Sequence, residues 1–312
     1  MRIEYHRTLI ADKVRNDAFY KALKSVIVPG KTTVADIGAG TGLLGLMASK
    51  LGARDVFLFE TAEVAGVAVK VLKANRAKNC HVFPCHSTEF QDPPRVDVVV
   101  SETLGNYAFE ENIVSTLHDA RTRFLRDGGV MIPARVTQFV APVIAPRIDA
   151  ELRAWERVGH GLDLGLAQSM SFNNAYVRTV KPAELLDGGA SAKAWDVVEL
   201  GQDKRASRKG EASWKAAKGA TAYGFAVWWV ADLAPGIALS TAPDAPRTHW
   251  EQLYFPLSEP VQLKAGETLL ASLRSQSTEE AGTHLAWTAV HFDSSGKSLA
   301  KQAHDLNKGF LP

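Results

Sequence analysis

The run VADIGAGTG (34–42) places an aspartate before three closely spaced glycines, Asp36, Gly38, Gly40 and Gly42. Glycines allow a tight turn between a strand and a helix, and they let a ligand lie against bare backbone. Dinucleotide-binding loops share this pattern. Here, however, an acidic residue precedes the first glycine, where it would meet an ammonium group. The third glycine also follows without the wider spacing that reaches a pyrophosphate. Both features favour S-adenosylmethionine as the cofactor.

A second carboxylate, Glu60, ends the apolar run DVFLFE (55–60) and follows Gly42 by 18 residues. A carboxylate at the end of the second strand of a nucleotide-binding sheet can accept both ribose hydroxyls. A solvated strand end is the alternative interpretation, and the glycine loop makes it the weaker one. We therefore predict that Glu60 binds the ribose of the cofactor.

Two further glutamates, Glu102 and Glu111, stand nine residues apart in the glycine-containing segment SETLGNYAFEE (101–111). This segment follows RVDVVV (95–100), which is apolar nearly throughout, as a strand buried on both faces should be. Ligands bind at the carboxyl ends of strands in open α/β sheets, so both glutamates are expected to face a ligand. Taken alone, two loop glutamates would be interpreted as solvated surface groups.

Two carboxylates in one pocket suit a guanidinium, which is planar and offers five N–H donors. An arginine guanidinium has a pKa above about 12, so it is a poor nucleophile until its charge is drawn away from the attacking nitrogen. The pair would hold the group with one nitrogen lone pair aimed at a methyl donor. The expected chemistry is direct methyl transfer to an arginine guanidinium, accelerated by positioning and electrostatics, with no metal.

The elements around these residues change character at Pro133. Up to that point strands and helices alternate, which predicts a parallel sheet with helices on both faces; the runs are 34–38, 41–52, 55–60, 62–76, 95–102 and 112–129. Beyond it, short strand-like runs separated by turn residues predict an antiparallel sandwich or barrel; they are 135–144, 223–233, 252–257, 268–275 and 285–293. The expected domains are 1–133 and 134–312.

The polar, basic stretch 201–219 is expected to be a solvated hairpin and loop. The chain has 312 residues, of which 46% are hydrophobic and 22% charged, an ordinary balance for a globular protein. With 36 Lys and Arg against 34 Asp and Glu, the net charge of +2 favours neither direct nucleic-acid binding nor membrane binding.

The chain contains two cysteines, Cys80 and Cys85, too few for a disulfide framework and not arranged for zinc. The first residues lack the apolar core of a signal peptide, and no apolar run reaches the roughly 20 residues that span a bilayer. A cytoplasmic setting is expected.

The chain resembles the protein arginine methyltransferases, a family of class I S-adenosylmethionine-dependent enzymes, in four separated motifs. The segment 34–60 is similar to the family's cofactor motif, and 101–111 to its double-glutamate loop. THWEQ (248–252) is similar to its threonine-histidine-tryptophan loop, and HRTLIADKVRNDAFY (6–20) to the first helices that close over the cofactor. The resemblance covers nearly the whole chain, and four motifs in order are far more specific than one.

For the cofactor, the resemblance implies that Arg15 pairs with its carboxylate and that Asp36, Gly38 and Gly40 shape its methionine side. Glu60 binds the ribose. Ser87 or Thr88 stands near the position of a residue that contacts the adenine, and Glu102 also borders the cofactor.

For the acceptor, the resemblance implies that Glu102 and Glu111 clamp the guanidinium. It implies that His249 pairs with Asp12 and completes the catalytic set, and that Trp250 packs beside the acceptor entrance. Taken alone, a histidine is more often structural than catalytic, and a tryptophan more often belongs to the core.

The family architecture is a Rossmann-like methyltransferase domain followed by an antiparallel β-barrel with a dimerisation arm, expected here at about 155–186, and the partner would be a second copy of the chain. The acceptor would be arginine in a protein or peptide. Methylation of free L-arginine or a small guanidine in a biosynthetic pathway is an alternative. A methyltransferase of an oxygen or carbon nucleophile would not need the two glutamates, and a non-catalytic cofactor-binding scaffold would have no reason to keep them.

Overall fold

The computed structural model of the chain describes residues 3–278 and 280–308. In this described part, the N-terminal domain is built on a five-stranded sheet in the order β3-β2-β1-β4-β5, in which every neighbouring pair is parallel. The strands are β1 (Thr33–Ile37), β2 (Asp55–Phe59), β3 (Cys80–Phe83), β4 (Val96–Ser101) and β5 (Leu125–Ile132). The strand order reverses between β1 and β4, which is where open α/β sheets bind ligands.

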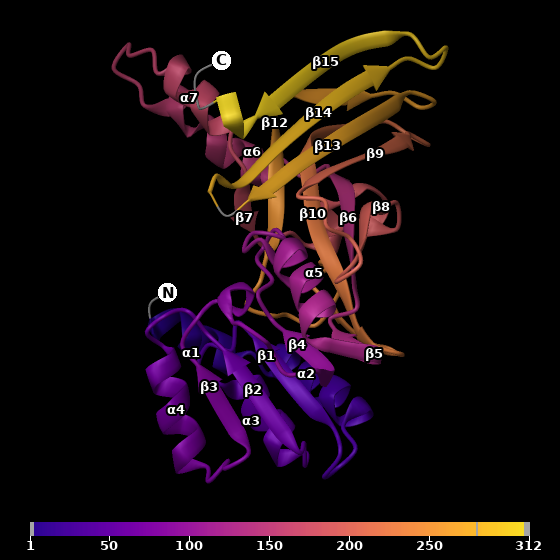
Figure 1. Cartoon of the computed structure of the whole chain (residues 1–312). Coiled ribbons are helices and arrows are strands. Elements are labelled where there is room, and N and C mark those ends of the chain that lie inside the picture. The colour runs from indigo at the N-terminus through magenta and orange to yellow at the C-terminus, as the bar shows by residue number, and fades with distance from the viewer. Residues whose placement is uncertain (1–2, 279, 309–312) are drawn as a thin grey trace.

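Helices cover this sheet and its carboxyl edge (Figure 1). They are α1 (Ile3–Ala11), α2 (Lys13–Val26), α3 (Leu43–Lys50), α4 (Ala65–Ala74), the short η1 (Ser87–Glu89) and α5 (Ile113–Arg123). The helix predicted over 112–129 is therefore too long. It ends at Arg123, and the rest of that segment begins β5, because pairing of Leu125 with Val96 and of Val130 with Val98 adds it to the sheet.

The second domain is antiparallel, as predicted, but its strands are hydrogen-bonded as two sheets and not as one closed barrel in the described residues. One sheet has the order β7-β12-β10-β6-β8 with β11 paired to β10, and the other has the order β15-β14-β13-β9. The strands are β6 (Arg135–Val143), β7 (Tyr176–Arg178), β8 (Lys193–Glu199), β9 (Ser207–Lys215), β10 (Ala220–Ala234), β11 (Ile237–Ser240), β12 (Gln252–Leu263), β13 (Thr268–Thr278), β14 (Gly282–Phe292) and β15 (Ser298–Asp305).

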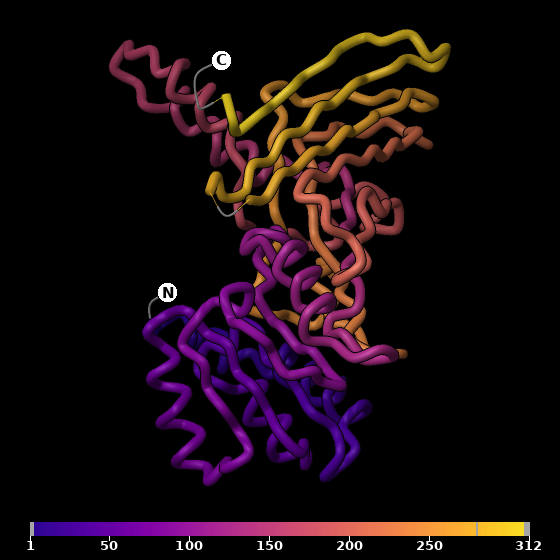
Figure 2. The backbone as a smooth tube through the Cα atoms, viewed as in Figure 1, coloured from indigo at the N-terminus to yellow at the C-terminus, as the bar shows by residue number. Residues whose placement is uncertain are grey.

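A helical projection leaves this domain between β6 and β8 (Figures 1 and 2). It contains α6 (Arg147–Leu152), η2 (Arg153–Arg157) and α7 (Gly165–Phe172), and η3 (Pro182–Glu184) and η4 (Leu186–Gly189) return the chain to β8; a last turn, η5 (Leu306–Lys308), follows β15. We call residues 153–172 the arm. It exposes large apolar side chains at Trp155, Val158, Leu162, Leu166 and Met170.

The two domains share one hydrophobic core. A single cluster of buried apolar side chains includes Leu23 of α2, Ile132 of β5 and Leu233 of β10. The relative position of the domains is therefore fixed by packing and not by a flexible linker. Of the helices in the described part of the chain, none has both the length and the apolar character needed to cross a bilayer.

Candidate functional site

A cavity lies at the carboxyl ends of β1, β2 and β4, beneath α1. It brings together residues that lie far apart in the sequence. The predicted site residues that line it are Arg15, Asp36, Gly38, Gly40, Glu60, Ser87, Glu102 and Glu111.

The glycine loop forms one wall of the cavity. Gly38, Gly40 and Gly42 all have positive φ angles, +73°, +56° and +81°, which glycine adopts without strain. A Cβ atom on Gly38 would lie 2.6 Å from the Cγ2 of Thr103, and one on Gly40 would lie 3.3 Å from the ring of His6. The loop thus requires glycine both for its backbone shape and for the closeness of its neighbours.

Asp36 lies under this loop, and in the described structure only one of its two carboxylate oxygens has a hydrogen-bond partner. Its Oδ2 accepts the N–H of Gly45 at 2.8 Å, and its Oδ1 is buried with no hydrogen-bond partner in the described structure. Burial raises the pKa of Asp36 to about 7. A buried, unpartnered acceptor at a cavity wall fits a cationic donor such as the ammonium group of S-adenosylmethionine.

Glu60 closes the loop from the end of β2. Its Oε2 accepts the N–H of Gly40 at 2.8 Å and its Oε1 that of Ala62 at 2.7 Å. Each carboxylate oxygen keeps a second lone pair, so both can still accept ribose hydroxyls.

Ser87 and Thr88, the two predicted adenine contacts, have different surroundings. Ser87 is buried at the cavity, with its hydroxyl unpartnered in the described structure. Thr88 lies outside the lining, is exposed, and bonds through its hydroxyl to Nδ1 of His86 at 2.6 Å. Ser87, and not Thr88, is therefore the residue placed to contact a cofactor.

Arg15 and Glu102 both line the cavity and form a buried ion pair with each other, with 7% and 3% of their side chains exposed. Both Nε and Nη2 of Arg15 contact Oε2 of Glu102, while Oε1 accepts the N–H of Leu104 at 3.2 Å. Arg15, the predicted partner of the cofactor carboxylate, is thus paired in this structure with Glu102, a predicted ligand of the guanidinium.

The adjacent glutamates Glu110 and Glu111 have different surroundings. Glu111 lines the cavity, and burial, together with the charges of Glu110 and Glu60, raises its pKa. Glu110 turns back into its own loop, where its Oε1 accepts the N–H of Tyr107 at 2.9 Å. A Cβ atom on Gly105 would lie 2.1 Å from Oε2 of Glu110, so the glycine makes room for that turn.

His249 and Trp250 lie in the loop before β12, and His249, like its partner Asp12, is outside the lining of the cavity. Nδ1 of His249 lies 2.7 Å from Oδ2 of Asp12, and the two side chains are almost fully buried. Trp250 does not line the cavity, contrary to the prediction of an entrance residue. It is 3% exposed and donates its indole N–H to the carbonyl of Leu104 at 2.9 Å, because it packs behind the loop against Trp229.

The segment 6–20 was predicted to close over the cofactor, but no site role was predicted for the individual residues on one face of α1. Tyr5, His6, Leu9 and Ile10 line the cavity at the spacing of one helix face. The Tyr5 ring lies edge-on to His249 at 6.4 Å, and burial and the charges of Glu102 and Glu111 raise its pKa. That spacing was the signal available in the sequence.

Comparisons with known proteins agree with this geometry. Residues 134–296 match the family described as arginine methyltransferase oligomerization subdomain, and residues 19–138 match the family described as ribosomal protein L11 methyltransferase. Protein arginine N-methyltransferase 6 of Xenopus tropicalis is 30% identical over 275 residues, which are 84% of this chain and 80% of that protein.

Two solved structures are similar over almost their full lengths. The Trypanosoma brucei PRMT1 enzyme–prozyme heterotetrameric complex with AdoHcy has a TM-score of 0.86 and 21% identity, covering 97% of this chain and 98% of that one. Arabidopsis thaliana protein arginine methyltransferase 10 has a TM-score of 0.80 and 22% identity, covering 98% of each chain.

The parallel sheet, its glycine loop and the antiparallel domain together define a class I S-adenosylmethionine-dependent methyltransferase. Within that class the chain belongs to the protein arginine methyltransferase family, because one family match spans more than half of it and the Xenopus relative is 30% identical. The family and fold predicted from four motifs are confirmed.

Proposed function

We propose that the chain transfers a methyl group from S-adenosylmethionine to a guanidinium nitrogen of arginine in a protein or peptide. The observation that carries this proposal is the presence of Glu102 and Glu111 in the same cavity as Asp36 and Glu60. One pair of carboxylates suits a guanidinium, and the other suits the ammonium and ribose of the cofactor.

The chain's own residues would bind and orient both reactants. When bound, S-adenosylmethionine supplies an electrophilic methyl group. Glu102 and Glu111 would accept N–H bonds from two guanidinium nitrogens, drawing positive charge toward them and leaving the third nitrogen more nucleophilic. Arg15 lies where it can bind Glu102 or a cofactor carboxylate. A methylated guanidinium must lose one proton. The carboxylate of Glu111 would accept it, because Glu111 lines the cavity and its pKa is raised.

Mass spectrometry of reaction products tests the proposal. The chain and S-adenosylmethionine are incubated with an arginine-rich peptide and, separately, with free L-arginine. Methylated peptide supports the proposal. Methylation of free arginine alone would favour the small-guanidine alternative, and transfer to neither would favour a non-catalytic scaffold.

We also propose that the chain works as a homodimer joined through its arm. The match to an oligomerization subdomain supports assembly, and the exposed Leu162 and Leu166 offer an apolar contact surface with 61% and 66% exposure. Light scattering at micromolar concentration should give twice the chain mass. Substituting both leucines by Asp should give a monomer, whereas Leu299→Asp, at a 51% exposed leucine of β15, should not. A wild-type monomer would contradict the proposal.

A cytoplasmic location is part of the same proposal. It is supported by Cys80 and Cys85, which are free cysteines. Fractionation of cells that express the chain, followed by immunoblotting, checks it.

A further inference from the structure

Tyr107 lies in the middle of the double-glutamate loop, between Glu102 and Glu111, and its side chain points away from the cavity into the antiparallel domain. It is 1% exposed. Its hydroxyl contacts Oγ of Ser275 on β13 and lies 3.3 Å from Nε2 of Gln138 on β6. A single side chain thus joins the acceptor loop to both sheets of the second domain.

The Tyr107 hydroxyl has two hydrogen-bond partners in this junction, Gln138 and Ser275. The amide nitrogen of Gln138 can only donate, so the Tyr107 oxygen accepts from it. Burial raises the pKa of Tyr107, so its hydroxyl keeps its proton at neutral pH. The second partner of the hydroxyl is Ser275 Oγ, and either oxygen of this pair can be the donor.

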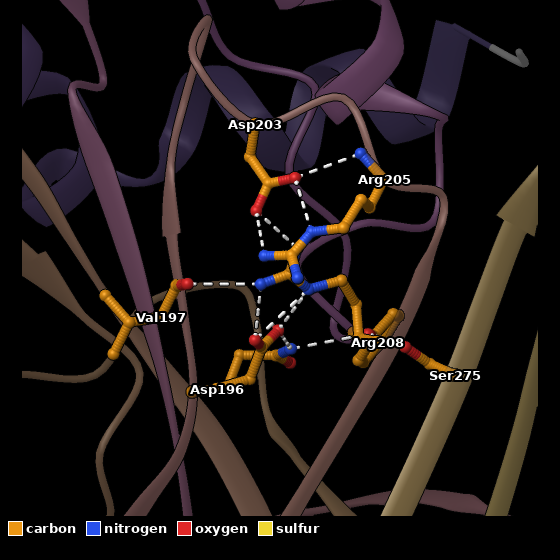
Figure 3. Close-up of polar contacts among 8 residues, drawn as sticks. Asp196, Val197, Asp203, Arg205, Arg208 and Ser275 are labelled. Atoms are coloured by element: carbon orange, nitrogen blue, oxygen red, sulfur yellow. Dashed lines mark hydrogen bonds and ion pairs between the residues drawn. The ribbon is translucent and has the colours of Figure 1, made fainter.

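Gln138 connects this junction to a buried ion pair. Its Nε2 also donates to Oδ2 of Asp196 at 3.3 Å. Arg208 holds the same carboxylate through Nε at 2.9 Å and Nη2 at 2.6 Å, and it reaches Asp203 through Nη1 at 2.6 Å (Figure 3). The Arg208 and Asp196 side chains are 5% and 6% exposed, so this end of the network is fixed by a well-hydrogen-bonded, desolvated pair.

The backbone of Tyr107 sets the direction of the following glutamates. Its N–H donates to Oε1 of Glu110, which holds that side chain inside the loop, and the carbonyl of Glu110 accepts the hydroxyl of Thr283 at 3.2 Å. With Glu110 held there, Glu111 faces the cavity. A shift of Tyr107 would therefore release the Glu110 side chain and change which carboxylate faces the acceptor.

We propose that Tyr107 is a positioning residue for the acceptor site: its hydroxyl, bound to Ser275 and Gln138, fixes the loop so that Glu102 and Glu111 face one guanidinium. This inference rests on the proposed function for its effect on turnover. It extends that function by making the antiparallel domain part of the acceptor site's geometry, through contacts 31 and 168 residues away in the sequence.

The test compares Tyr107→Phe with Tyr254→Phe. Tyr254 is a matched control, because it is fully buried in the antiparallel domain, into which the Tyr107 side chain points, and its hydroxyl also makes a hydrogen bond, to the carbonyl of Tyr223 at 2.8 Å. Both variants should lose a comparable amount of thermal stability. Only Tyr107→Phe should lower kcat for an arginine-rich peptide, by about tenfold or more, because small misplacements of reacting groups are costly. Its Kd for S-adenosylhomocysteine should stay within about twofold of the wild-type value.

Two further measurements separate positioning from general destabilisation and from the proposed function itself. Ser275→Ala should also lower kcat, and the double variant with Tyr107→Phe should be no slower than Tyr107→Phe alone, because the phenylalanine variant has already lost the bond to Ser275 together with the one to Gln138. Deuterium exchange of residues 102–112 with S-adenosylhomocysteine bound should be faster in Tyr107→Phe than in Tyr254→Phe. This readout does not need turnover. Unchanged exchange and unchanged kcat in Tyr107→Phe would overturn the inference, whereas lack of transfer by the wild type with faster loop exchange would overturn only the proposed function.

Discussion

His249 of the antiparallel domain and Asp12 of the N-terminal domain form a buried contact with 2.7 Å between Nδ1 and Oδ2. Asp12 also accepts the backbone N–H of His249 at 2.8 Å and, through Oδ1, the N–H of Arg15 at 2.9 Å, which caps α2. These bonds lower the pKa of Asp12 against the opposing effect of burial. Burial lowers the pKa of His249, whose Nε2 has no partner in the described structure, so the ring is neutral and donates from Nδ1. One carboxylate thus fixes both the start of α2 and the domain junction.

Asp12→Ala should destabilise the fold by about 2–4 kcal/mol, because it removes a helix cap and leaves a buried imidazole N–H unpaired. The free energy of unfolding from urea titration checks this. Asp17→Ala, which breaks the exposed pair with Lys13 on the same helix, should cost less than about 1 kcal/mol. Equal losses in the two variants would show that the junction carries no special stability.

Glu102→Gln should reduce methyl transfer at least about 100-fold, because the neutral amide cannot draw the charge of a guanidinium toward itself. S-adenosylhomocysteine should still bind, because Asp36 and Glu60 are untouched. Single-turnover rates and calorimetric binding measure the two effects. Near-normal turnover would contradict the acceptor clamp.

Glu111→Gln and Glu110→Gln form a matched pair of neighbouring substitutions. Glu111 lines the cavity, so its substitution should lower kcat by at least about tenfold with little change in stability. The amide oxygen of a glutamine at position 110 can still accept the N–H of Tyr107, so Glu110→Gln should keep most of the activity. The reverse order of the two effects would mean that Glu110 is the acceptor ligand.

His304 should make stability depend on pH. Its ring stacks on Trp287 at 4.9 Å, and burial lowers its pKa to about 4 from an unfolded value of about 6.5. The unfolded chain therefore binds more protons between these values, and the stability that is present above pH 6.5 is lost as the pH falls toward 4.

Between pH 7.5 and pH 5 this loss amounts to about 2 kcal/mol. Urea midpoints of the wild type and of His304→Phe, which keeps an aromatic ring on Trp287, measure it at the two pH values. The variant should lose less stability on acidification than the wild type. Parallel losses would assign the pH dependence to other groups.

Much of the cofactor side was predictable because its signals are local. Asp36, its glycines and Glu60 lie at the ends of two neighbouring strands, and a parallel sheet brings such ends together whatever the rest of the chain does. The four ordered motifs likewise identified the family before any contact was known.

Other features depended on partners that periodicity cannot reveal. The stretch 201–219, predicted to be a solvated hairpin and loop, contains Arg208, which is buried against Asp196. Residues 125–129 join the sheet because β4 offers them a free edge. Local sequence indicates neither the burial of Arg208 nor the pairing of residues 125–129, because the interactions that stabilise them come from a neighbour elsewhere in the chain.

The sequence by itself determined the family, the cofactor loop and the two glutamates of the acceptor loop, because these depend on residue type at short spacing. The tertiary structure decided that Glu102 meets Arg15, that Glu111 and not Glu110 faces the cavity, and that Trp250 and Tyr107 support the loop from behind. Each of these outcomes depends on which buried donors and acceptors find partners across the domain junction, and only the folded chain brings those groups within hydrogen-bonding distance.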